Sequence, residues 1–352
     1  APKLTVIIPA YNEGPMVKKA IYSVLATQYP LEKLEIMVID DGSRDDTWSY
    51  IKAAFIENPS LVTAVRFSHN KGKRAALEEG FRRARGEIVV TLDSDSVIES
   101  RTLLEIAGPF RDPKVGAVAG RVAVFNREQG ILPKMLKVRF LFSFDVLRAV
   151  QSTYRTVYCC PGALSAYRTS VVRQVLDQWV NQVFLGTTCT YGEDRAMTNY
   201  ILSEGYNTVY QRSAQVYTIV PWTYKKLWKM YLRWDRSYVR ETIRLFKIVW
   251  KRPFWPLIST LVDLFITNLR FPIGYLNLVL LAVFSVQHPV TVLRLFCVIG
   301  LFSLMNMLYY LKNERSWDFL YGILYSYFSL LALFWIFPYA LFTLRSRSWM
   351  TR

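Results

Sequence analysis

The chain has 352 residues, of which 52% are hydrophobic and 15% aromatic, and its formal net charge is +17 at pH 7. This length is enough for one large domain with additional elements. The charge restricts the partner to nucleic acid or an anionic membrane surface, and the sequence carries no zinc-finger spacing or other nucleic-acid motif. Residues 222–252 hold ten Lys or Arg and two acids, directly before apolar sequence. Cations in that position favour lipid headgroups, so we expect a lipid bilayer partner and no nucleic acid.

The first part of the chain, residues 4–125, alternates strand and helix patterns. Apolar runs bounded by Gly, Ser and Asp predict buried parallel strands, and the segments between them predict helices. This alternation predicts an α/β domain with a mostly parallel sheet and helices on both faces. The strands are expected at residues 4–9, 34–39, 62–67, 88–92 and 115–124, and the helices at residues 15–27, 45–57, 71–84 and 100–110.

The rest of the chain is divided by composition. Residues 130–150 predict a helix that lies in a membrane interface, inside a cytosolic domain of residues 1–220. Residues 221–252 predict a basic, aromatic interfacial helix. Its aromatic stripe would face the headgroups, or alternatively the protein core. Residues 253–352 predict a membrane region of about three spans. These spans are expected at residues 254–286, 290–311 and 319–344, the first being one tilted span or two short helices.

Four cysteines are present, and they show no framework spacing. Cys159 and Cys160 are adjacent and therefore poor disulfide partners, while Cys189 and Cys297 stand apart. A reducing, cytosolic setting for the globular part is the simplest interpretation.

Two acidic clusters stand where predicted strands end. Residues 40–43 (DDGS) follow the second strand, and Asp93-Ser94-Asp95 follows the fourth. Ligands of open α/β sheets bind at the carboxyl ends of the strands, so these carboxylates predict a divalent cation and a phosphorylated substrate. The alternatives are a surface turn for the second cluster and a helix N-cap formed by Ser43 or Asp45 for the first.

Four further segments suggest parts of a site. Residues 9–13 (PAYNE) end the first strand, where a Tyr ring could stack on a base, or they form an ordinary turn. Residues 70–74 (NKGKR) place cations at a helix start, which suggests a nearby phosphate or else a solvated basic face. Residues 189–195 (CTYGEDR) offer a general base or a plain helix start. In residues 232–234 (LRW), Arg suits a diphosphate and Trp a sugar face.

The order of these motifs resembles the processive family 2 glycosyltransferases. PAYNE, DDGS, NKGKR, DSDS, YGEDR and LRWDRSYVRE precede the membrane spans, as in hyaluronan synthases and chitin-oligosaccharide synthases and, more distantly, cellulose synthases. The ending, residues 341–344 and 348–352, is similar as well. The resemblance implies an inverting enzyme with a cytosolic GT-A fold in a multi-pass protein of the cell membrane. It also implies spans before the catalytic domain, supplied by residues that precede this sequence or by another membrane subunit.

The resemblance further implies a role for individual residues. Four aspartates far apart in the chain would converge around one metal-bound sugar nucleotide, with Asp194 as the catalytic base. Nucleotide binding would fall to Tyr11, Glu13 and Asp41 on the uridine, with Lys73, Asp93 and Arg233 near the diphosphate. Asp93 and Asp95 would hold Mg²⁺ or Mn²⁺. The acceptor glycan would meet Trp234, Cys160, Gly162 and Glu193.

The activity that the resemblance implies is transfer of a sugar from a UDP-sugar, with UDP-GlcNAc and UDP-GlcA favoured, to a growing β-linked polysaccharide, coupled to its export. Met230 and Tyr231 stand where the family has Gln, and the acceptor segment reads Cys-Pro-Gly where relatives have Gly-Pro. These departures leave open a non-processive transferase that adds one sugar to a lipid carrier. A weakly catalytic export subunit is the other alternative, although all the acidic motifs are present.

Overall fold

The computed structural model describes residues 1–287 and 289–346 of the chain. A central eight-stranded sheet organises the first two thirds of the molecule. The strand order is β3-β2-β1-β4-β7-β6-β10-β5. Neighbouring pairs from β3 to β4 are parallel, as are β6 and β10, whereas β7 and β5 run antiparallel to their neighbours. The strands are β1 Leu4–Ala10, β2 Leu34–Asp40, β3 Val62–Arg66, β4 Ile88–Leu92, β5 Ser96–Ile98, β6 Val115–Val124, β7 Leu164–Arg168 and β10 Asn207–Thr218. A separate hairpin pairs β8 Val183–Phe184 with β9 Thr187–Thr188.

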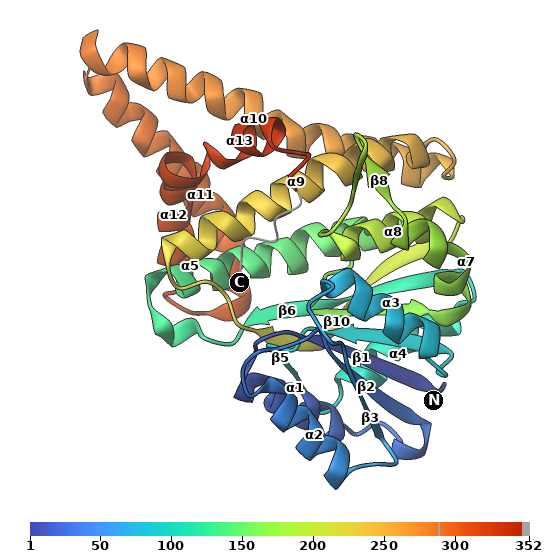
Figure 1. The fold of residues 1–352 in the computed structure, drawn as a ribbon. Coiled ribbons are helices and arrows are strands. Elements are labelled where there is room, and N and C mark those ends of the chain that lie inside the picture. Colours follow the sequence, from blue (N-terminus) through green and yellow to red (C-terminus); the bar gives the residue numbers. More distant parts are fainter. Residues whose placement is uncertain (288, 347–352) are drawn as a thin grey trace.

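Helices cover both faces of this sheet, as the alternating pattern predicts (Figure 1). Successive residues of a strand point to opposite faces, so Val6 and Ile8 join one apolar cluster and Ile7 the other. Complete burial of a side chain of this size contributes roughly 1.5–3 kcal/mol. The covering helices are α1 Pro15–Leu25, α2 Thr47–Glu57 and α4 Thr102–Ala107 on the first face, and α3 Lys73–Arg83, α7 Thr169–Val180 and α8 Glu193–Ser203 on the second.

Strands β5, β7 and β10 were not predicted from the sequence. β7 is five residues long and carries Ser165 and Ala166, so it lacks the β-branched run that marks a strand. β10 is long, but it is rich in polar residues and its pairing shifts register between Gln211 and Gln215. The five predicted strands are all present, and the sheet is mixed because two of the unpredicted strands, β5 and β7, run antiparallel to their neighbours.

The segment around residues 130–150 is helical, and its apolar side chains pack mainly against protein. It consists of α5 Ile131–Leu141, a π-helical stretch Phe142–Arg148 and α6 Ala149–Thr153. Leu136 and Phe140 enter the core against the sheet, and Val138 packs with Tyr310 of a C-terminal helix. The segment therefore connects the sheet to the C-terminal helices.

Helix α9, Tyr224–Val249, confirms a helix in the basic, aromatic segment. Leu227 of its aromatic stripe is buried, the Tyr231 hydroxyl bonds Tyr325 (2.7 Å), and the Tyr238 hydroxyl donates to Asn268 (3.2 Å). These three residues of the stripe face other helices, as the core-facing alternative predicts, whereas Trp234, the fourth residue of the stripe, is 40% exposed. Two of the arginines on its other faces, Arg236 and Arg240, are also buried rather than solvated.

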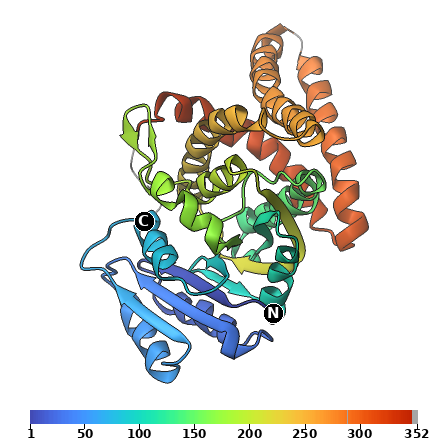
Figure 2. The ribbon, with the colours of Figure 1, turned by 90° about the vertical axis from the view of Figure 1, so that its right-hand side faces the viewer.

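The C-terminal helices form a separate group beside the sheet (Figures 1 and 2). They are α10 Phe254–Gln287, α11 Pro289–Glu314, α12 Phe319–Phe328, a π-helical stretch Ser329–Leu333 and α13 Ile336–Phe342. Two of them are long and apolar enough to cross a membrane, α10 with a mean hydropathy of 1.4 and α11 with 1.8. A bent pair, Phe319–Leu333 with Ile336–Phe342 at 41°, would bring the number to three.

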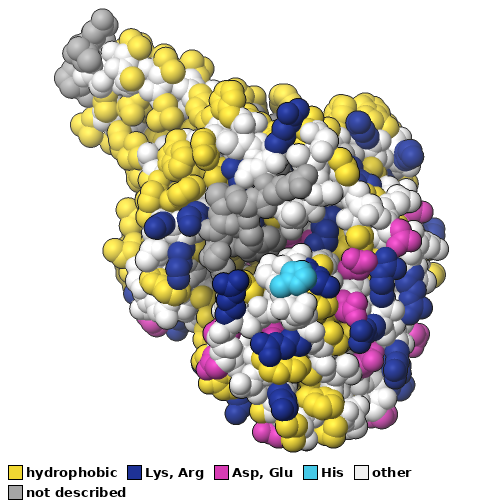
Figure 3. Space-filling view, in the orientation of Figure 1, with side chains coloured by type: hydrophobic (Ala, Val, Ile, Leu, Met, Phe, Trp, Pro, Cys, Tyr) yellow, Lys and Arg dark blue, Asp and Glu magenta, His cyan; other side chains and the backbone are white. Residues whose placement is uncertain are grey.

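The first candidate span is one helix and not a hairpin, since α10 continues through Pro272. Hydrophobic side chains cover the part of α10 and α11 that projects from the sheet domain, whereas charged side chains are spread over that domain (Figure 3). Residues 348–352, whose sequence resembles the family's ending, lie outside the described residues.

Candidate active site

Three strand-end loops meet at one edge of the sheet, as the acidic clusters predict. The backbone N–H of Asn12 donates to the hydroxyl of Ser43 (3.0 Å), which ties the loop after β1 to the loop after β2. The hydroxyl of Ser94 donates to Glu13 Oε1 (3.0 Å), which ties the first loop to the loop after β4. Tyr11 lies half-buried in the first loop. The carboxyl ends of these strands therefore form one surface.

Asp41 is buried and is engaged by the chain itself. Its Oδ1 accepts from the backbone of Lys71 (2.7 Å), and its Oδ2 accepts from Gly72 (2.9 Å) and from Asn70 Nδ2 (3.0 Å). Burial raises the pKa of this carboxyl although those hydrogen bonds lower it. Gly42 beside it has φ +71°, and a Cβ there would lie 2.5 Å from the backbone of His69. Asp41 thus fixes the loop that leads into α3.

The first residue of α3, Lys73, lies between two carboxylates. Its Nζ pairs with Asp93 Oδ1 and with Glu193 Oε1, the latter at 3.2 Å. Burial lowers the pKa of Lys73, but the two carboxylates outweigh it and raise that pKa above its usual value. Arg74 is buried and donates to Gln182 Oε1 (3.1 Å). Neither cation belongs to a solvated basic face, so that alternative is wrong for these two residues.

Two acids open helix α8, where carboxylates are favoured by the helix dipole. Asp194 Oδ2 accepts from the backbone N–H of Gly162 (3.1 Å). Burial and the neighbouring charge of Glu193 raise the pKa of Asp194. Burial also pushes the pKa of Glu193 upward, but Lys73, with a contribution from Arg233, holds it below its usual value. The pair therefore combines a Glu193 whose pKa is lowered with an Asp194 whose pKa is raised.

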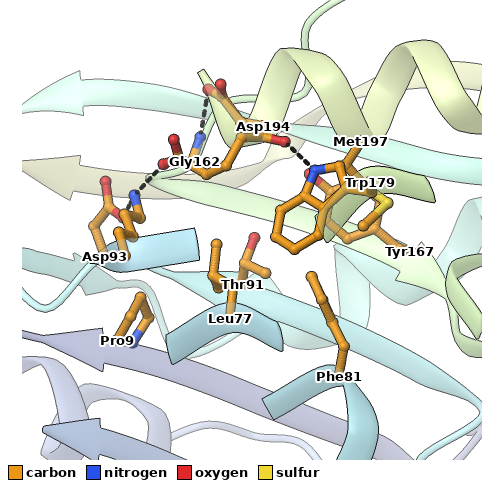
Figure 4. Close-up of a pocket in the computed structure, with 12 residues that line it drawn as sticks. Pro9, Leu77, Phe81, Thr91, Asp93, Gly162, Tyr167, Trp179, Asp194 and Met197 are labelled. Atoms are coloured by element: carbon orange, nitrogen blue, oxygen red, sulfur yellow. Dashed lines mark hydrogen bonds and ion pairs between the residues drawn. The ribbon is translucent and has the colours of Figure 1, made fainter. Parts of the chain in front are cut away.

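These groups line one small cavity, shown in Figure 4. Asp93, Gly162 and Asp194 lie at one end of it, and the rings of Trp179 and Phe81 lie at the other. A Cβ on Gly162 would come within 2.9 Å of Lys73 Nζ, so a larger residue would displace that ammonium. The lining residues are Pro9, Lys73, Leu77, Phe81, Thr91, Asp93, Gly162, Tyr167, Trp179, Glu193, Asp194 and Met197.

The four aspartates do not all meet in this cavity. Asp93 and Asp194 line it, whereas Asp41 and Asp95 do not. Asp95 Oδ1 accepts from the hydroxyls of Ser96 and Thr218 (both 3.2 Å), which turns it toward β10. Two of the four aspartates, Asp93 and Asp194, therefore share this cavity, and the convergence of all four around one metal-bound nucleotide stays a prediction.

Asp93 and Asp95 fit a divalent cation that is held partly by the substrate. No group of three or more His, Cys, Asp or Glu suited to a metal occurs among residues 1–287 and 289–346. Mg²⁺ is commonly held by one or two carboxylates together with substrate phosphates and water, rather than by a protein cage. Asp93 and Asp95, two residues apart at the sheet edge, supply hard oxygen ligands of that number.

The predicted acceptor-binding residues differ in how far they are exposed. The side chain of Trp234 on α9 is 40% exposed, and its ring lies 5.5 Å from that of Tyr231. Cys160 is completely buried in the core, and its backbone N–H donates to Thr198 (3.0 Å). Its side chain therefore packs in the core, and Gly162 is the residue of that segment that borders the cavity.

Sequence reasoning missed a buried polar cluster behind the site. Glu241 of α9 accepts from Gln182 Nε2 (2.8 Å) and Asn199 Nδ2 (3.1 Å), and Arg240 donates to it as well (2.8 Å). Adjacent opposite charges in the middle of a helix with a strong apolar face are a signal that could have indicated burial.

Comparisons with known proteins agree on the class of molecule. The family description Glycosyl transferase family 2 matches residues 5–176. A hyaluronan synthase of Streptococcus pyogenes is 31% identical over 99% of this chain and 83% of its own length. N-acetylglucosaminyltransferases of Azorhizobium caulinodans and Rhizobium meliloti are 30% and 31% identical, over 100% of this chain and 87% and 82% of their own lengths. Among solved structures, a mannosyltransferase from Pyrobaculum calidifontis in complex with GDP-Man and Mn²⁺ has a TM-score of 0.60 at 21% identity, covering 94% of this chain and 87% of that one.

Proposed function

Because the chain belongs to glycosyltransferase family 2 and is a GT-A glycosyltransferase, we propose that it transfers sugar from UDP-GlcNAc, UDP-GlcA or both to a growing β-linked polysaccharide. One observation carries this proposal: Asp93, Lys73 and Asp194, from three separate elements, line a single cavity at the carboxyl edge of the sheet. The relatives named as hyaluronan synthase and N-acetylglucosaminyltransferase support the class of donor.

Asp194 acts as the general base in this proposal. An acceptor hydroxyl oxygen forms a bond to the anomeric carbon, the bond from that carbon to the diphosphate breaks, and the hydroxyl proton passes to Asp194. Burial and Glu193 raise the pKa of Asp194, which makes it a better proton acceptor than a solvated aspartate. Attack opposite the leaving diphosphate inverts the anomeric centre.

The leaving diphosphate is stabilised by positive charge. Lys73 lies against Asp93 and remains charged, and Arg233 is close enough to influence the charge state of Glu193. Asp93 and Asp95 would hold Mg²⁺ or Mn²⁺, which when bound neutralises the diphosphate as it departs. The mannosyltransferase from Pyrobaculum calidifontis, solved in complex with GDP-Man and Mn²⁺, is consistent with this requirement.

The nucleotide would lie over the loops after β1 and β2. Tyr11 and Glu13 belong to the first of these loops and are proposed to contact the uridine. Asp41 supports the same site through its hydrogen bonds to the loop that carries Lys73. The acceptor would stack on the exposed ring of Trp234 and reach the cavity past Gly162 and Glu193.

Membrane association follows from the two long apolar helices, and export of the product is part of the proposal. Residues 1–220 would be cytosolic, with the helix of residues 221–252 at the bilayer surface and residues 253–352 crossing the cell membrane. Asp263 in α10 accepts from Gln151 Nε2 (2.9 Å) and from the hydroxyl of Tyr158, so it faces the protein. A charged side chain in a membrane helix is expected to turn away from lipid in this way. Polar groups on that side of α10 would line a route for the polymer.

A transferase that adds one sugar to a lipid carrier is the second candidate, and one observation bears on it. Met230 is buried in the core, and Tyr231 bonds Tyr325 on α12. These two side chains, which replace the family's Gln residues, therefore do not border the cavity, and the polar contacts that Gln would provide are lost.

Product analysis tests the proposal directly. The purified protein would be incubated with UDP-GlcNAc, UDP-GlcA and UDP-glucose, singly and in pairs, and the products sized. We expect a polymer with release of UDP in the absence of any other protein. A lipid-linked monosaccharide would favour the second candidate, and no UDP release from any donor would reject both.

A further inference from the structure

A carboxylate buried in α9 is connected to the site without bordering it. Glu241 is 1% exposed, and both of its carboxylate oxygens are occupied. One accepts from Gln182 and Arg240, and the other from Asn199, whose amide also donates to the backbone carbonyl of Glu241 (2.9 Å). A buried charge is costly unless it is fully paired, so each of these partners is held in place.

The first connection runs from Glu241 through Arg240 to the turn before α8. Arg240 Nη2 donates to the backbone carbonyl of Tyr191 (2.6 Å), and its guanidinium lies 5.5 Å from the centre of the Tyr191 ring. The next residue, Gly192, has φ +72°, and a Cβ there would lie 2.4 Å from Ser237 of α9. The turn that precedes Glu193 and Asp194 is thus pressed against α9.

The second connection runs from Glu241 through Gln182 to the opposite side of the same turn. Gln182 Oε1 accepts from Arg74 Nη2 (3.1 Å), and Arg74 also donates to the carbonyl of Trp179. The indole N–H of Trp179 donates to the backbone carbonyl of Glu193 (2.9 Å). Since Arg74 follows Lys73, this connection reaches both the acids and the lysine of the cavity.

We propose that Glu241 is a positioning residue for the transfer reaction. It holds the N-terminal turn of α8 between α9 and the end of α7, and so sets the position of Asp194 relative to Gly162 and Lys73. This inference rests on the proposed role of Asp194 as the base. Displacement of a reacting group by about 1 Å can cost roughly 100-fold in rate, so the arrangement serves catalysis as well as folding.

The test is Glu241→Gln, which keeps the size and removes the charge that pairs with Arg240. We expect kcat to fall about 10- to 100-fold, while KM for the UDP-sugar changes less than kcat does, since the second connection reaches Lys73 only through its neighbour Arg74. The acid limb of the pH profile should move to lower pH. Burial raises the pKa of Asp194, and a loosened turn admits water and lowers that pKa again.

Asp145→Asn is the matched control. Asp145 is also a buried carboxylate on a helix beside the sheet, paired with Arg121 Nε and Nη2 (2.9 and 3.0 Å) and with Arg212 (3.2 Å). These partners lie on β6 and β10 and not on the turn before α8. The control should lower the thermal unfolding temperature but leave the acid limb in place.

Two further variants keep the outcome interpretable. Arg240→Lys retains the charge beside Glu241 but shortens the reach to Tyr191. We expect it to lower kcat and to move the acid limb to lower pH, both by less than Glu241→Gln does. It replaces Glu241→Gln as the test where that variant folds poorly. Asp194→Asn serves as the reference for the base. If Asp194→Asn is inactive while Glu241→Gln and Arg240→Lys keep wild-type kcat and acid limb, the positioning role is wrong and the proposed function stands. If Asp194→Asn is active, the proposed function itself fails.

Discussion

The strands of the sheet and the projecting helices α10 and α11 use the same apolar residue types in opposite ways. Ile7, Ile36 and Val89 in the sheet are completely buried, whereas Phe265 and Leu293 on the helices are 66% and 65% exposed. Polar groups show the inverse: Asp93 and Asp194 lie at the edge of the sheet, while Asp263 of α10 turns toward protein. The sheet thus places charge at one of its edges, whereas the exposed apolar faces of the two long helices are suited to a lipid environment.

The largest effect on activity is expected at the charged edge of the sheet. We expect Asp93→Asn to lower the transfer rate by about 1,000-fold, because a metal on the diphosphate supplies several kcal/mol of transition-state stabilisation. A chelator should abolish the activity of the unchanged protein, and Mg²⁺ or Mn²⁺ should restore it. Rates of UDP release measure both effects.

The control for that variant is Asp112→Asn. Asp112 pairs with Arg155 away from the cavity, so the rate should stay within about twofold of the unchanged protein. Equal losses in the two variants would show that the edge of the sheet has no special role.

A matched pair of truncations separates the two apolar regions. Ile36→Ala removes a fully buried side chain and should lower the free energy of unfolding by about 2–5 kcal/mol. Leu293→Ala removes an exposed one and should change it by less than about 0.5 kcal/mol in detergent. Thermal unfolding of both variants in one detergent gives the comparison. A large loss for Leu293→Ala would mean that this face packs against protein and not against lipid.

The pH dependence of the activity tests the raised pKa of Asp194 at the edge of the sheet. Burial and Glu193 raise the pKa of Asp194, so activity should be lost, as pH falls, at a pH above the ordinary aspartate pKa of about 3.9. Glu193→Gln removes the second of these causes and should move the acid limb to lower pH. A shift to higher pH would contradict the assignment of that limb to Asp194.

The smallest expected effect concerns the basic helix between the two regions. Lys225 is exposed near the start of α9, and one cation near an anionic bilayer contributes about 1 kcal/mol. Lys225→Gln should therefore weaken binding to vesicles that contain phosphatidylserine about fivefold at low salt. The difference should disappear at 1 M salt, and an unchanged affinity at low salt would place this face of α9 away from the membrane.

Much of the fold could be predicted because local sequence dictates it. β1 and β4 are mainly apolar runs followed by turn residues, and they form neighbouring parallel strands that are fully buried. β7 and β10 could not be predicted, since their strand character comes from long-range pairing with β4 and β6 and not from their own residues.

The site was predicted where neighbouring residues carry the chemistry, and missed where distant contacts do. Asp93 and Asp194 line one cavity as expected, because each follows from a motif at the end of an element. The hydroxyl of Thr218, more than a hundred residues away, donates to Asp95, and no local motif predicts that contact. Glu241 was missed because two of its partners, Gln182 and Asn199, lie far from it in the chain; the adjacent charge of Arg240 signals burial but does not identify those partners.

The most direct measurement is polymer synthesis by Asp194→Asn together with its affinity for the UDP-sugar. Asn keeps the size of the side chain and its bond from Gly162 but cannot take the acceptor proton. We expect the transfer rate to fall by about 10²- to 10⁴-fold, with UDP-sugar binding unchanged. Wild-type polymer synthesis by this variant would contradict the central claim that Asp194 is the base of a sugar transfer at this edge of the sheet.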